Sequence, residues 1–516
     1  MQIKPALFAV FWPAAALAQE PLSVIDWLGS AYKAPASGYK APVAGGSVLL
    51  EPPVAKAALR PSIEVSPLED APVATGLVAT TVTGLPVDLW RGSDPRQLIR
   101  LITDAPVQDS PAMQALLYTL LLAEKLPPTG ANADEANRLM LAQIDRLIVL
   151  GAVDPALALV EQAGPTRDAE FFRRWFDAAL LSGEEDRPCA ALLAAPYLSP
   201  DYAALIFCTA RSGDWETAAL TLETVRTLDL LPAPKIELID RFLNADLFDG
   251  APPLPAPETP DPLTFRLYEA IGERLPSSTL PRAFANADLG DLAGWKAQIE
   301  AAERLTRTGA LNPNKLLGLY TDRRPAASGG VWDRVMAVQR FDIALSTGSA
   351  EAVTKTLPKV WEQMRMAGLE VPFAHLFADR LAPLKLAGQA ETIAWKIELL
   401  GPDYEAFSHH PPDNSRDNTF LAALAQGDPG RADAPDDLSR AVARGFSPEA
   451  KPPQDLAEAI DSGRLGEVIL RCILSFDRGA HGNPTELTDS LATLRAVGLE
   501  DTARRAALQL LLIGAV

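Results

Sequence analysis

Three cysteines are the residues whose spacing points most directly to chemistry. Cys189 and Cys208 lie at equal distance from a predicted turn at 196–199, between a helix over about 188–195 and a helix beginning at Pro200. Residues equidistant from the turn of an antiparallel helix pair face each other, so the spacing predicts a disulfide in an oxidising compartment. Two buried thiols in helix cores are the alternative. Cys472 is expected to be a buried thiol rather than a nucleophile.

The four histidines give no comparable pattern. His409 and His410 lie near Asp413 and Asp417, but adjacent histidines project in different directions and lack the i, i+4 spacing of a helical ligand pair. His375 is interpreted as a residue at the edge of the core. The sequence contains no phosphate-binding P-loop, no dinucleotide-binding glycine motif, no Gly-x-Ser-x-Gly and no His-Glu-x-x-His. It therefore predicts no catalytic residue, no metal site and no cofactor.

The N-terminus carries the pattern of an export signal. Lys4 precedes an uncharged segment that begins at Pro5, contains several large apolar residues and ends in Ala16-Leu17-Ala18, a small-x-small cleavage pattern. A membrane anchor is the alternative, but the segment is shorter than the roughly 20 residues that a membrane span needs. We expect a signal peptide over 1–18, cleavage after Ala18 and a periplasmic location, with no stable membrane span in the mature chain.

Two segments of different character follow the signal. Residues 19–32 hold a short apolar motif, predicted to dock into a groove of this chain or of a partner, or else to lie loosely on the fold as a remnant helix; its members are Val24, Ile25, Trp27 and Leu28. Residues 33–86 are rich in proline and alanine, show no helical period, and are predicted to form a disordered tether.

From residue 87 onwards the pattern predicts helices. Apolar residues recur at helical spacing, helix starts read as Ser-Pro, Asp-Pro or Asn-Pro, and helix ends carry glycine. The six expected starts are Ser110-Pro111, Asp154-Pro155, Ser199-Pro200, Asn312-Pro313, Ser447-Pro448 and Asn483-Pro484. Short gaps predict antiparallel neighbours.

Degenerate repeats favour an all-α, irregular α-solenoid over generic antiparallel helices. Ser212-Gly213-Asp214-Trp215 and the residues after it resemble the turn and opening helix of a tetratricopeptide-type hairpin. A Pro-rich break at 250–262 is predicted to separate an N-terminal helical-repeat half over 87–249 from a C-terminal half over 263–516.

Charge limits the classes of partner. The chain has 47 Lys plus Arg against 66 Asp plus Glu, a formal net charge of −19. Such a chain is repelled by nucleic-acid phosphates and by anionic lipid headgroups. We therefore expect no nucleic-acid partner.

Two N-terminal motifs carry a family resemblance. Residues 21–28, Pro-Leu-Ser-Val-Ile-Asp-Trp-Leu, and residues 82–90, Val-Thr-Gly-Leu-Pro-Val-Asp-Leu-Trp, are similar to a family of alphaproteobacterial exported helical-repeat proteins, some of which are labelled "antifreeze glycopeptide-related". Antifreeze glycopeptides are repeated Ala-Ala-Thr tracts, and this chain has no such array. The resemblance implies export and transfers no functional residue.

Export, helical repeats and the lack of catalytic motifs predict a non-enzymatic periplasmic scaffold or adaptor that binds an envelope protein or peptide. An accessory module or enzyme of cell-wall metabolism is one alternative, which would need paired carboxylates in a cleft. A periplasmic protein that binds a small molecule between helices is the other.

Overall fold

The computed structural model describes residues 74–107, 109–290 and 292–514, and within these ranges the regular structure is entirely helical. The α-helices are α2 (Thr80–Thr83), α3 (Pro95–Asp104), α4 (Pro111–Leu122), α5 (Ala133–Leu150), α6 (Val153–Ala163), α7 (Ala169–Ser182), α8 (Asp186–Ala194), α9 (Tyr202–Arg211), α10 (Trp215–Thr227), α11 (Ala233–Leu243), α12 (Pro262–Ala270), α13 (Trp295–Thr306), α14 (Pro313–Asp322), α15 (Val331–Ser346), α16 (Ala350–Met366), α17 (Glu370–Leu381), α18 (Gln389–Leu400), α19 (Tyr404–Phe407), α20 (Arg416–Ala425), α21 (Asp437–Gly445), α22 (Gln454–Asp461), α23 (Leu465–Ala480), α24 (Pro484–Ala496) and α25 (Glu500–Ile513). Short 3₁₀ helices are η1 (Pro196–Leu198), η2 (Ala245–Phe248), η3 (Ser277–Thr279), η4 (Arg282–Leu289) and η5 (Pro429–Arg431).

Capping side chains start many of these helices. Ser110, Asn312 and Asn483 each accept a hydrogen bond from a main-chain N–H of the first turn and precede a proline at the first helical position, as predicted. The other three expected starts are wrong in detail. Helix α6 begins at Val153, α9 is capped by Asp201, and Ser447-Pro448 does not start a helix.

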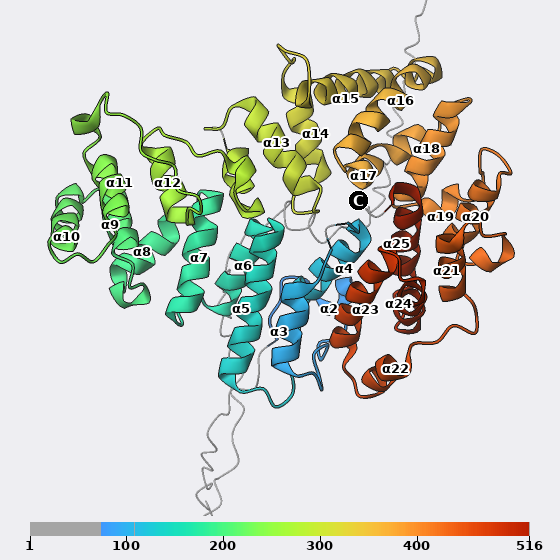
Figure 1. Cartoon of the computed structure of the whole chain (residues 1–516), viewed down its shortest axis with the longest axis horizontal. Helices are drawn as coiled ribbons and strands as arrows, with labels where there is room; N and C mark the ends of the chain where they lie inside the picture. Colours follow the sequence, from blue (N-terminus) through green and yellow to red (C-terminus); the bar gives the residue numbers. More distant parts are fainter. Residues whose placement is uncertain (1–73, 108, 291, 515–516) are drawn as a thin grey trace, which may run out of the picture.

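The helices form a solenoid-like array that turns back on itself (Figure 1). From α3 the chain runs outward through α5–α9 to an arm formed by α8–α11, returns through α12 and α13, and continues through α15–α21. The last helices then reach the first ones, because α23 packs on α3 and α4 and α25 packs on α4. The all-α, solenoid-like fold predicted from the sequence is confirmed.

Close packing at one glycine shows how the two ends of the array meet. Trp90 is 1% exposed and lies against Gly466 of α23. A Cβ atom at Gly466 would lie 2.2 Å from Cζ3 of Trp90, so only glycine allows this approach. The Gly466 N–H donates to the Leu89 carbonyl at 2.9 Å, which ties the beginning of α23 to the segment before α3.

The buried core divides differently from the two predicted halves. One hydrophobic cluster joins buried residues between Val78 and Phe284 to buried residues between Trp395 and Leu510. A second cluster holds buried residues between Ala285 and Leu400. The break at 250–262 therefore lies within one core, since Leu254 packs on the first cluster. Residues on both sides of the break share that core because α11 and α12 pack against each other.

The predicted tether extends too far toward the C-terminus. Residues 74–86, which the sequence assigned to the tether over 33–86, are ordered and partly buried: isolated bridges pair Thr75 with Lys125 and Val78 with Ala123, and Val78 is 3% exposed. This segment lies along the end of α4 and hydrogen-bonds to its last carbonyls. The predicted signal peptide over 1–18, the predicted docking motif at 19–32 and residues 33–73 lie outside the described residues.

The arm carries two sequence features that the structure confirms. Cys189 of α8 and Cys208 of α9 form a disulfide with Cα atoms 4.9 Å apart. The turn at 212–214 joins α9 to α10 as a helical hairpin, and the Asp214 side chain accepts from the Thr217 N–H at 3.1 Å. Trp215 at the start of α10 is 48% exposed, because α10 is the outermost helix of the arm.

Candidate functional site

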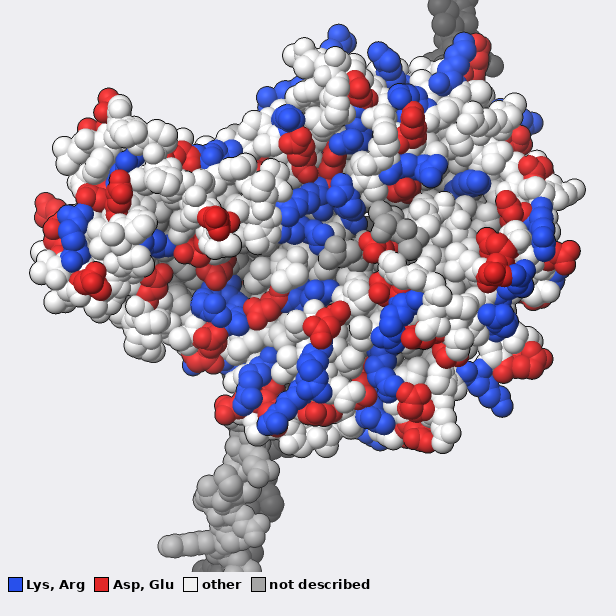
Figure 2. Space-filling view, viewed as in Figure 1, with Lys and Arg blue, Asp and Glu red and all other residues white. Residues whose placement is uncertain are grey.

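Four arginines from separate parts of the chain converge beside the end of α5. We call Arg146 of α5, Arg282 of η4, Arg304 of α13 and Arg307, which follows α13, the arginine cluster. Burial lowers the pKa of Arg282, and the neighbouring charges of the other three lower it further. Burial and the charge of Arg307 likewise lower the pKa of Arg304. Figure 2 shows Lys and Arg side chains gathered at the middle of one face, between α13–α14 and α6.

The end of α5 brings these side chains together. Gly151 closes α5 in a left-handed conformation with φ 88°, and a Cβ there would lie 2.7 Å from Leu305 Cδ2 and 3.0 Å from Arg282 Cγ. The Thr308 hydroxyl donates to the Leu150 carbonyl at 3.1 Å, which ties α13 to the same helix end. A side chain at 151 would push the stem of Arg282 out of the cluster.

Neutral carbonyls, rather than carboxylates, hold the arginines in place. Three of the four donate to main-chain oxygens of neighbouring loops: Arg146 to Ala105, Arg304 to Ser277 (2.9 Å) and Leu280 (2.6 Å), and Arg307 to Ala367 (2.8 Å). A carbonyl fixes the orientation of a guanidinium without cancelling its charge. The cluster is therefore ordered and still positive.

Arg282 is the member of the cluster with the fewest internal polar contacts. Within the described ranges its guanidinium makes no hydrogen bond and no ion pair, and its buried Nε, like that of Arg146, has no acceptor. Elsewhere, half-buried arginines are paired, as Arg174 is with Asp145 and Arg334 with Glu303. An uncompensated cluster of cations destabilises the free protein and favours bound anions.

Two carboxylates lie close to the cluster without pairing with it. The charge of Asp104 opposes the lowering of the Arg146 pKa by burial, without a hydrogen bond or ion pair between the two side chains. Glu370 at the start of α17 lies near Arg307 and Arg365. Burial raises the pKa of Glu370, while the two arginines oppose that rise. Together they offset part of the cluster's charge, but neither forms an ion pair with one of its four guanidinium groups.

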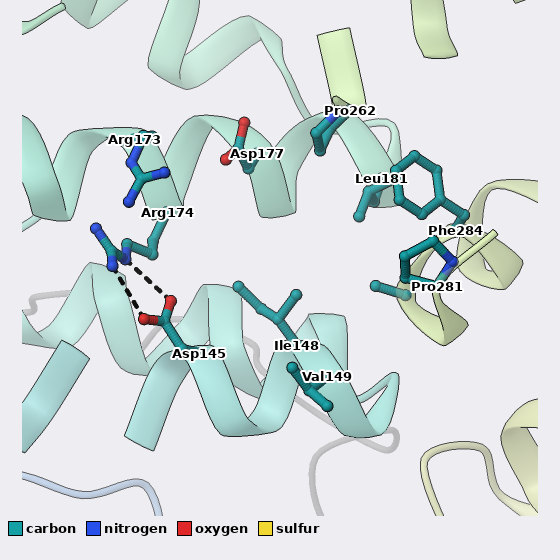
Figure 3. A pocket seen from close by; sticks show the side chains of 11 residues that line it. Asp145, Ile148, Val149, Arg173, Arg174, Asp177, Leu181, Pro262, Pro281 and Phe284 are labelled. Carbon is teal, nitrogen blue, oxygen red and sulfur yellow. Dashed lines mark hydrogen bonds and ion pairs between the residues drawn. The ribbon is translucent and has the colours of Figure 1, made fainter. Parts of the chain in front are cut away.

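A cavity of about 190 Å³ lies on the other side of the 281–284 segment, between α5, α7, α12 and η4 (Figure 3). Its walls are apolar, from Ile148, Val149, Leu181, Pro262, Pro281, Ala283 and Phe284. Small-molecule sites usually measure about 300–1,000 Å³, so this cavity is sized for one side chain or a very small ligand.

Two carboxylates in the cavity have opposite environments. Arg174 holds Asp145 through two hydrogen bonds, from Nε at 3.0 Å and from the terminal nitrogen at 2.9 Å. Burial raises the pKa of Asp177 to about 7, with Asp261 adding to the rise and Arg173 opposing it. Asp145 is thus paired with a guanidinium, whereas burial favours the protonated form of Asp177, and acid–base catalysis uses carboxylates whose surroundings differ in this way.

A third cluster joins parts of the chain that are far apart in sequence. Asp109, Asp477 and His481 each place a possible ligand atom within 4.8 Å of the others. His481 Nδ1 lies 2.8 Å from the Asp477 carbonyl, and its Nε2 lies 3.6 Å from Asp109. All three side chains are partly or fully exposed. Asp477 and His481 have the i, i+4 spacing of a helical ligand pair, a signal that the sequence reasoning missed, whereas Asp109 lies before α4 and joins them only in the folded chain.

The sequence-predicted residues have several outcomes. Cys189 and Cys208 are bonded, and Cys472 is fully buried, with a pKa raised by burial to about 12, as expected of an inert thiol. His409 and His410 are exposed beside α19 and are not among the described residues that form a candidate metal group. The docking motif of Val24, Ile25, Trp27 and Leu28 lies outside the described residues.

None of the described helices combines the length and apolarity needed to cross a membrane. A buried disulfide is typical of proteins from oxidising compartments. No family model matches the chain, and neither the curated proteins nor the solved structures contain a match to it.

Proposed function

We propose that this protein is a non-enzymatic scaffold or adaptor of the periplasm that binds an envelope protein or peptide through its helical array. The observation that carries the proposal is the arginine cluster, whose charges lack carboxylate partners in the described part of the chain. Functional sites commonly keep such groups at a cost in stability, because the ligand supplies the missing interactions.

The proposed location rests on two independent features. Residues 1–18 have the pattern of a cleaved export signal, and Cys189 and Cys208 form a disulfide. A periplasmic protein meets envelope proteins and peptides rather than cytoplasmic nucleotides, which agrees with the lack of a nucleotide-binding motif in the sequence.

Site-specific photocrosslinking in cells tests the proposal. Met366 is 65% exposed and adjoins Ala367, the residue that holds Arg307, so a photoreactive amino acid at 366 samples the surface beside the cluster. Leu220, 69% exposed on the outer helix α10, is the matched control position. We expect a discrete crosslinked partner from position 366 and none shared with 220. Adducts that are identical at both positions, or absent from both, contradict the proposal.

An enzyme of cell-wall metabolism is the second candidate, and the cavity of Figure 3 is the observation that favours it. Asp177 would donate a proton, and Asp145 would remain paired with Arg174. We place it second because the cavity is smaller than an ordinary small-molecule site. The same volume limits the small-molecule alternative. Turnover of isolated cell wall by the wild-type chain and its loss in Asp177→Asn would reverse this order.

A further inference from the structure

We infer, on the basis of the proposed function, that the arginine cluster recognises a short acidic segment of the partner, in which neighbouring Asp or Glu side chains supply carboxylates. Four guanidinium groups reach the cluster from α5 and from the segment of η4 and α13, which lies more than a hundred residues later in the sequence. The proposal assigns these arginines a binding role that no local sequence pattern indicates.

The chemistry of the cluster favours carboxylates held in two-point contacts. A guanidinium presents N–H groups in a planar fork that matches the two oxygens of a carboxylate, and charge-assisted pairs of this kind are about twice as strong as neutral hydrogen bonds. Carbonyl contacts already orient Arg304 and Arg307, so little side-chain freedom remains to be lost on binding. Arg282 makes no hydrogen bond or ion pair with the described residues, so its terminal guanidinium nitrogens are not used by an internal acceptor, although its Nε is buried.

The charge of the remaining chain limits the length of the ligand. With a net charge of −19, the surface beyond the cluster repels a long polyanion such as a nucleic acid. A short acidic segment places its charges only where the arginines lie. Asp104 and Glu370 near the cluster also make it less positive than four isolated arginines, which suits singly charged carboxylates better than doubly charged phosphate.

Direct binding of a defined peptide tests the inference. The probe is a fluorescein-labelled hexaglutamate peptide, measured by fluorescence polarisation with the full chain at low ionic strength and again at physiological salt. Hexaglutamine with the same label is the neutral control. We expect hexaglutamate to bind, hexaglutamine not to bind, and added salt to weaken the complex because exposed charges are screened.

Variants connect binding to the cluster. Arg282→Gln and Arg307→Gln are each expected to weaken hexaglutamate binding about tenfold, and Arg307→Lys less, since it keeps the charge but loses the fork. Arg324→Gln, at an exposed arginine outside the cluster, is the matched control and should bind like the wild type. Arg282→Gln should unfold at the same or a higher temperature than the wild type, because it relieves repulsion between like charges.

Three outcomes overturn the inference. The first is that the wild-type chain does not bind hexaglutamate. The second is an equal loss of hexaglutamate affinity in Arg324→Gln and Arg307→Gln. The third is displacement of the labelled peptide by inorganic phosphate at a lower concentration than by unlabelled glutamate peptides. A partner crosslinked from position 366 together with any of these outcomes leaves the proposed function intact and rejects only the acidic-segment inference. Conversely, binding of hexaglutamate to the cluster without a crosslinked partner from position 366 rejects the proposed function and leaves only the recognition of acidic segments.

Discussion

The disulfide between Cys189 and Cys208 should determine the local stability of the arm. It closes a loop with a sequence separation of 19 between α8 and α9. In the chain-entropy model, closing a loop of about 20 residues removes about 3 kcal/mol of unfolded-state freedom at 25 °C. Both cysteines are buried, at 4% and 0% exposure, so the bond joins α8 and α9 within the core of the arm.

Hydrogen exchange measures this effect where it should occur. Solenoid-like arrays open locally, so the arm need not unfold with the rest. We compare protein refolded with the bond closed against protein refolded and kept in reductant, using peptides that cover α8 and α9. Since about 1.4 kcal/mol corresponds to a tenfold change, we expect exchange in these helices to accelerate about a hundredfold when the bond is open.

Peptides from α24 and α25, which lie at the other end of the chain and make no contact with the arm in Figure 1, are the internal control. Equal exchange of α8 and α9 in both forms would refute the assignment of the arm's stability to this bond. Acceleration spread evenly over all helices would instead show that the described part unfolds as one unit.

Three further predictions concern buried groups and close packing. Burial lowers the pKa of Lys125 from 10.5 to about 7, so between these pH values only the unfolded chain holds the proton and the free energy of unfolding rises with pH. Urea titrations should show a smaller rise of this free energy in Lys125→Met than in the wild type. An identical rise in both proteins would contradict the assignment to Lys125. Burial raises the pKa of Asp177 from 3.8 to about 7, so the folded chain holds an extra proton and stability falls as pH rises through that interval; Asp177→Asn should be more stable than the wild type at pH 8 by about 1 kcal/mol or more and unchanged near pH 4. Gly466→Ala should lower the free energy of unfolding in urea by about 1–3 kcal/mol, because its Cβ overlaps Trp90. Gly318→Ala, with nothing within 4 Å, is the control and should be neutral or stabilising. Equal effects of the two substitutions would be evidence against close packing where α23 meets the segment before α3.

Local chemistry explains what the sequence predicted well. The pairing of Cys189 with Cys208 followed from their equal distance from a turn, and caps such as Ser110 satisfy N–H groups within one helical turn. The helix start predicted at Asp154-Pro155 is wrong by two residues, and the N–H groups of the first turn explain this too. The first turn of a helix has free N–H groups, so Pro155 fits at the third helical position as well as at the first.

The arginine cluster was beyond sequence reasoning for a physical reason. Arg146 lies in α5 and Arg307 follows α13, so the whole arm separates them in sequence. They meet only because η4 packs on both α5 and α13, and because Leu305 lies against Gly151 at the end of α5. The closure of the array has the same character, since Trp90 and Gly466 meet across most of the chain. Periodicity identifies helices, but it does not determine which distant helices become neighbours.

Binding of labelled hexaglutamate to the full wild-type chain and to Arg282→Gln tests the central claim most directly. Arg282 is the residue to change because its guanidinium makes no hydrogen bond and no ion pair with the described residues, so its replacement breaks neither. The account predicts salt-sensitive binding by the wild type, about tenfold weaker binding by the variant, and undiminished thermal stability. Equal affinity for the two proteins, or no binding by either, would contradict it.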